Sequence, residues 1–233
     1  MSDDIVKTVL PEFRKRIEEA DKIAGQIGEK IGIVSPFEST ISGVEGKIKI
    51  LLDIQKYLKW KRRIARPETI LAVVDIGTLE VISAKIVEWQ RIDYYSQYGK
   101  EGGIIPYPIV PDERGLATRP QAIAEPLLAF KLKNNKELVG GSIADYVIEP
   151  RSPVVLPKPE YLEVLSGIKG DVTLGALTIG EEIVEVGDSI AKVRIPLADM
   201  LYHTFIVGTT GSGKTSFLKN LIRSLLLARS RKG

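Results

Sequence analysis

One glycine-rich stretch, GTTGSGKT at residues 208–215, constrains the fold of this chain more than any other feature. It fits the pattern G-x-x-x-x-G-K-[ST], in which glycines permit a tight turn and a close approach of the backbone to a ligand. The apolar run Phe205-Ile206-Val207 precedes it and predicts a buried parallel strand. Apolar residues recur at helical spacing after it, at Phe217, Leu218, Leu221, Ile222 and Leu225. The sequence therefore predicts a strand, a phosphate-binding loop and a helix, in that order.

Each position of this loop has a chemical role. The N–H groups of Gly211, Gly213 and Lys214 bind phosphate oxygens at the positive end of the following helix. Lys214 is the predicted catalytic residue because its ammonium neutralises charge on the β- and γ-phosphates, and the Thr215 hydroxyl is the predicted Mg²⁺ ligand. The cofactors expected are ATP and Mg²⁺. The full predicted nucleotide site is Gly208, Thr209, Thr210, Gly211, Ser212, Gly213, Lys214, Thr215 and Ser216.

Composition narrows the class of protein only moderately. The 233 residues include no cysteine, which excludes disulfides and cysteine-ligated zinc. His203 is the single histidine, so a metal site built on several histidines is also excluded. A net charge of +3 permits a nucleic-acid partner without requiring one. We find no signal-peptide pattern and no stretch of about 18 apolar residues, and we therefore expect a cytoplasmic protein without a membrane partner.

The chain is predicted to have three regions. Residues 1–66 have apolar residues at helical spacing, with Pro11 expected to interrupt the pattern or to start the main helix, and form an N-terminal helical extension. Residues 67–196 contain short β-branched runs between turns, which predict a small β-barrel or sandwich. Within it, 94–121 is expected to be a packed irregular loop, and the proline-rich 149–161 a connection and possible boundary. Residues 197–233 begin the nucleotide-binding domain.

A basic cluster ends the second predicted helix, at about residues 46–63. It comprises Lys56, Lys59, Lys61, Arg62, Arg63 and Arg66, with Tyr57 and Trp60 among them. Basic residues beside aromatic ones can contact nucleic acid. The interpretation that we favour is a solvated helix end, since cations there also complement the helix dipole.

The order of these regions resembles the HerA-type ATPases of the HerA/FtsK group of P-loop DNA translocases. His203, a few residues before the loop, and residues 208–215 carry the resemblance, and the stretch 173–197 looks like the end of that family's HAS-barrel. The resemblance implies an α+β fold: N-terminal helices, a small HAS-barrel-like domain, and the first strand, P-loop and helix of a truncated α/β ATPase domain. It also implies ATP hydrolysis, a homo-hexameric ring, double-stranded DNA, and a NurA-like nuclease partner in DNA-end processing.

The position of the loop adds a further expectation. A P-loop ATPase needs an acidic residue on a second strand, and only residues 216–233 follow the loop. We therefore expect the chain to be the N-terminal part of a longer DNA translocase or helicase, and to be inactive as an ATPase alone. The alternatives are a secretion- or conjugation-type ring ATPase, and a non-catalytic module that docks a partner.

Overall fold

The structure, a computed structural model, describes residues 2–36, 46–92, 119–134, 136–179, 182–186, 189–201 and 203–230. The chain divides into two compact units, residues 1–157 (unit 1) and residues 158–233 (unit 2). The sequence analysis placed boundaries after residues 66 and 196, whereas this division lies within the proline-rich connection, between Pro157 and Lys158. Most of the predicted 94–121 loop, with its tyrosines, lies outside the described residues.

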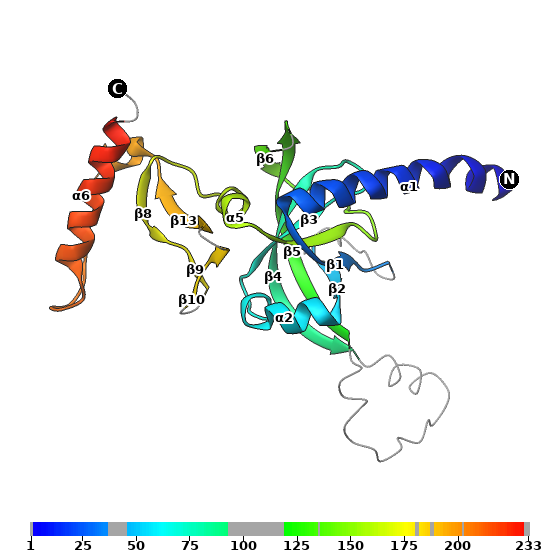
Figure 1. Ribbon diagram of the computed structural model, residues 1–233, viewed down its shortest axis with the longest axis horizontal. Coiled ribbons are helices and arrows are strands. Elements are labelled where there is room, and N and C mark those ends of the chain that lie inside the picture. The colour runs from blue at the N-terminus through cyan, green and yellow to red at the C-terminus, as the bar shows by residue number, and fades with distance from the viewer. Residues whose placement is uncertain are drawn as a thin grey trace, which may run out of the picture. The chain divides into compact units, whose positions relative to one another are not determined.

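Unit 1 is built on an antiparallel sheet (Figure 1). Hydrogen-bonded neighbours follow the order β2-β1-β7-β3-β4-β5-β6, and β2 pairs with β5 as well. Six strands therefore form a closed cycle of pairings, with β6 added along β5. The elements are α1 (Ser2–Ile27), β1 (Gly28–Val34), β2 (Ile48–Leu52), α2 (Ile54–Ile64), β3 (Ile70–Val74), β4 (Val81–Ile92), β5 (Arg119–Lys133), β6 (Glu137–Ile143) and β7 (Pro153–Pro157).

The core of unit 1 consists of the inward-facing aliphatic residues of these strands. Ile31, Ile50, Leu71 and Ile86 are all fully buried there, although they come from four different strands. The long β5 makes this possible because it pairs with β4 along most of its length and with β2 and β6 at different points. Because the cycle closes, few strand edges in the described part of unit 1 lack a hydrogen-bonding partner within the unit.

Helix α1 covers part of this sheet with apolar side chains. Ala20, Ala24 and Ile27 are fully buried, and the helix contacts β1, β3 and β7 (Figure 1). The helical prediction for the start of the chain is therefore confirmed. The expectation that Pro11 would interrupt or start the helix was wrong, because α1 runs through it. Proline removes one backbone hydrogen bond, and the neighbouring turns of a long helix can hold the axis across that loss.

The prediction of helix across the rest of residues 1–66 was also wrong in part. Gly28–Val34 and Ile48–Leu52 are strands, and only Ile54–Ile64 of the second predicted helix is helical. Ile48–Leu52 is a short run rich in apolar residues, which fits a buried strand and a buried helix segment equally well. Gly28–Val34 has the charged Glu29 and Lys30 before its apolar residues, so its local pattern did not indicate a strand. Their distant partners decided the outcome, since β1 pairs with β7 and β2 pairs with β5.

Unit 2 contains short strand pairs between two helices. Its two-stranded pairs are β8 with β13, β9 with β10, and β11 with β12. The residues 173–197 that the sequence analysis assigned to the barrel therefore lie in unit 2 and add no strand to the sheet of unit 1. The elements are α5 (Pro159–Leu165), β8 (Val172–Ala176), β9 (Thr178–Ile179), β10 (Glu182–Ile183), β11 (Glu185–Val186), β12 (Ser189–Ile190), β13 (Lys192–Ile195), the 3₁₀ helix η1 (Leu197–Leu201) and α6 (Lys214–Ser230).

Helix α6 packs on β8 to form the small core of unit 2 (Figure 1). Val172, Leu221 and Ala228 are its buried members, with Ile206 and Leu225 packed against them. None of the helices in the described residues is both long and apolar enough to cross a membrane.

Candidate functional site

The glycine-rich loop leads directly into α6, as predicted. Helix α6 starts at Lys214, and the Phe217 N–H donates to the Gly213 carbonyl at 2.9 Å as its first turn closes. The N–H groups of Lys214, Thr215 and Ser216 precede that bond and have no acceptor within the helix. They therefore provide three donors at the positive end of α6, where an anion is favoured.

Glycine suits three positions of this loop, two because of their backbone conformation and one because side chains lie close to it. Gly211 and Gly213 have φ values of +83° and +85°, a region that side chains with a Cβ rarely adopt. A Cβ on Gly208 would lie 2.5 Å from the Ser212 hydroxyl oxygen and 3.3 Å from Lys214 Cγ. The Ser212 N–H closes the turn by donating to the Thr209 carbonyl at 3.2 Å. The pattern of glycines in the sequence thus corresponds to specific backbone requirements.

The Lys214 ammonium is held at the mouth of the loop. It donates hydrogen bonds to the backbone carbonyls of Gly208 and Thr209, the second at 2.6 Å. An ammonium has three donors, so these two contacts orient the group and leave it a further donor for a ligand. Thr215 is exposed one residue further on, at the start of α6.

A cavity of about 480 Å³ adjoins the loop, within the usual size range of ligand sites. Its lining combines loop residues with an apolar wall, and none of the described residues that line it is acidic. The lining residues are Phe205, Ile206, Val207, Gly208, Ser212, Gly213, Lys214 and Phe217. The sequence analysis did not place the aromatic side chains of Phe205 and Phe217 at the site, since both were interpreted as parts of a buried strand and a packed helix face.

The predicted parallel strand before the loop is not formed. Residues 205–207 have no strand assignment, and Phe205 and Val207 are 90% and 71% exposed. A parallel strand needs hydrogen-bonding neighbours, and no described residue pairs with this segment. Ile206 alone packs inward, against the core under α6. His203, which carried part of the family resemblance, is exposed and does not line the cavity.

The donor set of the loop fits a nucleotide phosphate with Mg²⁺. Backbone N–H groups and an ammonium are complementary to phosphate oxygens, and a threonine hydroxyl is an oxygen ligand of the kind that Mg²⁺ accepts. Lys214 and the helix N–H groups would hold the phosphates, and Thr215 would hold the ion. When bound, Mg²⁺ would neutralise phosphate charge.

Comparison with known families gives a match for this part of the chain. Residues 175–231 match the FtsK/SpoIIIE family. This is a family of P-loop DNA translocases, so the match points to a DNA-translocating ATPase at the level of the family. The match begins within β8 and includes the loop and α6, but it does not include unit 1. No curated protein matches the chain.

The basic helix α2 is largely occupied by contacts within unit 1. Glu29 accepts hydrogen bonds from Lys56 Nζ at 2.5 Å, Lys59 Nζ at 2.9 Å and Trp60 Nε1 at 3.0 Å. These contacts, led by Lys56, lower the pKa of Glu29 to about 2, although burial opposes them. Arg63 donates to the Pro157 carbonyl, and burial lowers its pKa. Lys56, Lys59 and Trp60 therefore attach α2 to Glu29 of β1. These contacts favour the interpretation of the basic cluster as a helix end over its interpretation as a nucleic-acid contact.

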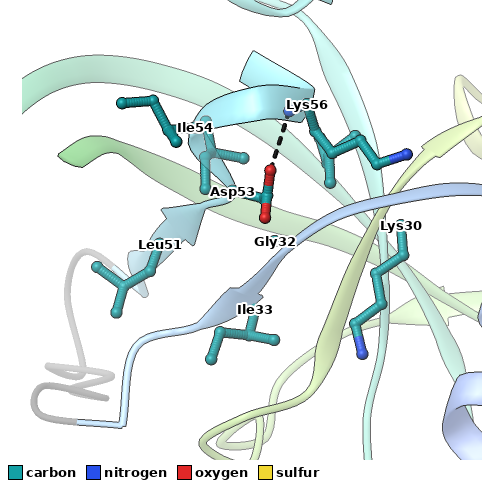
Figure 2. Close-up of a pocket in the computed structure, with 9 residues that line it drawn as sticks. Lys30, Gly32, Ile33, Leu51, Asp53, Ile54 and Lys56 are labelled. Atoms are coloured by element: carbon teal, nitrogen blue, oxygen red, sulfur yellow. Dashed lines mark hydrogen bonds between the residues drawn. The ribbon is translucent and has the colours of Figure 1, made fainter. Parts of the chain in front are cut away.

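A second cavity, of about 620 Å³, lies over β1, β2 and the start of α2. Figure 2 shows Ile33, Leu51 and Ile54 on one side of it and two lysines on the other. Lys30 forms an ion pair with Asp21, and Lys56 forms one with Glu29. Asp53 caps α2 by accepting from the Lys56 N–H at 3.0 Å. Each charged group on the rim thus already has a structural partner, and we assign the functional site to the loop of unit 2.

Proposed function

We propose that the chain is part of an ATP-dependent translocase of double-stranded DNA, and that unit 2 supplies its phosphate-binding loop. The loop geometry carries this proposal: Lys214 lines a cavity of about 480 Å³, and Thr215 and the first N–H groups of α6 follow at the same helix start. The match of residues 175–231 to a family of DNA translocases supports the choice of DNA among the substrates of P-loop proteins. The cytoplasm remains the predicted location.

Nucleotide binding by the purified chain tests whether the loop of unit 2 binds the phosphates of ATP. A fluorescent ATP analogue with Mg²⁺ should bind, and Lys214→Ala should weaken binding by at least about tenfold, since a charge-assisted phosphate contact contributes roughly 1.5–3 kcal/mol. Lys219→Ala is the matched control, because Lys219 is an exposed lysine on the same helix. Equal binding by all three proteins would contradict the assigned site.

Hydrolysis is a separate step, and the cavity has no described acidic residue to order an attacking water. We therefore propose that this chain by itself binds ATP without turning it over. Turnover by the purified chain that disappears in Lys214→Ala would overturn this part. In a longer form that hydrolyses ATP, stimulation by linear double-stranded DNA would separate a DNA translocase from a secretion-type ATPase.

Unit 1 supports a more specific proposal. Its closed cycle of six antiparallel strands precedes the loop domain in the chain, as a HAS-barrel precedes the motor in HerA-type ATPases. We propose that unit 1 is a HAS-barrel-like docking domain of a hexameric HerA-type ATPase, with a NurA-like nuclease as its partner in DNA-end processing. Binding of a NurA-type nuclease to the chain, measured by calorimetry, tests this. Ring assembly without nuclease binding would favour another ring ATPase.

A further inference from the structure

The two-stranded sheet β8–β13 lies between both helices of unit 2 and is bonded to each by a side chain. On the α6 side, the Thr173 N–H of β8 donates to the Ser224 hydroxyl at 2.7 Å. Thr173 pairs with Arg194 of β13 on its other side. Ser224 therefore satisfies a backbone donor on the free edge of β8 and fixes the helix against the strand.

Glu163 makes the equivalent connection from α5 to β13. It is 9% exposed, and its Oε1 accepts the Lys192 N–H at 2.7 Å. Its Oε2 lies 3.2 Å from Arg194 Nη1. A nearly buried carboxylate is stable only when it is paired and hydrogen-bonded, and both oxygens of Glu163 meet that condition on a single strand.

These contacts make a continuous path between the P-loop helix and the first helix of unit 2. Helix α6 begins at Lys214 in the candidate site, and its Leu221 and Ala228 pack with Val172 of β8. Strand β8 is hydrogen-bonded to β13, and β13 is bonded to α5. Helix α5 begins at Pro159, two residues after Pro157, the last residue of unit 1. Connected hydrogen bonds and packed side chains of this kind can carry energetic coupling.

We propose that the β8–β13 sheet couples nucleotide binding at the loop to α5, with Glu163 and Ser224 as the positioning residues at its two ends. Nucleotide bound at the start of α6 orders that helix, the Ser224 contact orders β8, and Glu163 passes the change to the segment that joins unit 1. The proposal rests on the proposed function, because it needs the loop to bind nucleotide.

Hydrogen exchange of the complete chain, with and without a non-hydrolysable ATP analogue and Mg²⁺, tests the coupling. In the wild type, nucleotide should slow exchange of the α5 amides by about fivefold or more, the lower end of typical coupling between sites. Glu163→Ala should reduce that protection to less than about twofold while nucleotide still binds. Glu163→Gln keeps an acceptor for the Lys192 N–H but loses the charge facing Arg194, and should fall between the two.

Glu160→Gln is the matched control, since Glu160 is an exposed glutamate on the same helix. Nucleotide binding is measured on every variant, so the two proposals fail separately. Wild-type chain that binds nucleotide with no change in α5 exchange would overturn the coupling alone. Absence of nucleotide binding in the wild type would overturn the proposed function and the coupling with it. If Glu163→Ala does not fold, Glu163→Gln and Ser224→Ala test the coupling in its place. Slowing of α5 amide exchange by nucleotide to the wild-type extent in both variants would contradict the proposal.

Discussion

Unit 1 and unit 2 bury their apolar residues to very different extents. The strands of unit 1 close into a cycle, and Leu71 and Ile86 are fully buried within it. In unit 2 the described strands form separate pairs. Its exposed apolar side chains include Leu226 of α6, which is 64% exposed, and Phe205 and Val207, which are more exposed still. Phe205 and Val207 line the cavity beside the loop, so apolar side chains are exposed at the candidate site. Unit 1 therefore has the properties of a self-contained domain, whereas the surface around the candidate site is suited to further contacts.

A matched pair of core substitutions should give the largest effect. Leu71→Ala removes a fully buried side chain in unit 1 and should lower its free energy of unfolding by about 2–5 kcal/mol. Trp60 and Trp89, the two tryptophans of the chain, both lie in unit 1, so their fluorescence reports its unfolding in urea. Leu221→Ala, in the small core of unit 2, should leave that transition unchanged. Equal shifts from both variants would show that the units unfold as one.

Acid should weaken unit 1 through Glu29. The pKa of Glu29 is lowered from 4.5 to about 2 in the folded chain, chiefly by the Lys56 hydrogen bond. A lowered carboxyl pKa stabilises the fold fully above the unfolded value, and this stabilisation is lost as the pH falls from about 4.5 through about 2. Because the group is partly exposed, we expect the loss to be on the order of 1 kcal/mol.

Glu29→Gln isolates this effect. Urea unfolding of unit 1 is measured at neutral pH and at a pH between 4.5 and about 2, the unfolded and folded pKa values of Glu29. The acid-induced loss of stability should be smaller in the variant than in the wild type. The same loss in both proteins would mean that other carboxyl groups, and not the attachment of α2 to β1, control the acid sensitivity of unit 1.

The smallest effect on stability is expected on the exposed side of α6. Leu226→Ser should change the free energy of unfolding by no more than about 0.5 kcal/mol, because the side chain is mostly in solvent. It should nevertheless reduce binding of a hydrophobic dye, since it removes apolar surface. Leu221→Ser, on the buried side of the same helix, is the contrast and should destabilise unit 2 strongly. Strong destabilisation by Leu226→Ser would show that this side of α6 is covered.

Several elements could be predicted from local sequence because local interactions decide them. The glycine loop needs positive φ at Gly211 and Gly213, and only a few residue types permit that. A local turn that includes Gly77 and Thr78 separates β3 from β4. The proline-rich stretch 149–161 contains the boundary after Pro157, but its residues Pro153–Pro157 form strand β7 and are not a simple connection. In the loop and the turn, by contrast, the backbone conformation depends on residues that are adjacent in the chain.

The sequence by itself determined the glycine-rich loop at residues 208–215, the helix behind it and the long first helix. Tertiary structure alone decided that the runs at 28–34 and 48–52 are strands, that 205–207 is not, and that 173–197 belongs with the loop. A helix satisfies its backbone hydrogen bonds within one segment, and a glycine turn does so within a few residues. A strand needs a partner from elsewhere in the chain, and a local pattern cannot show whether that partner is present.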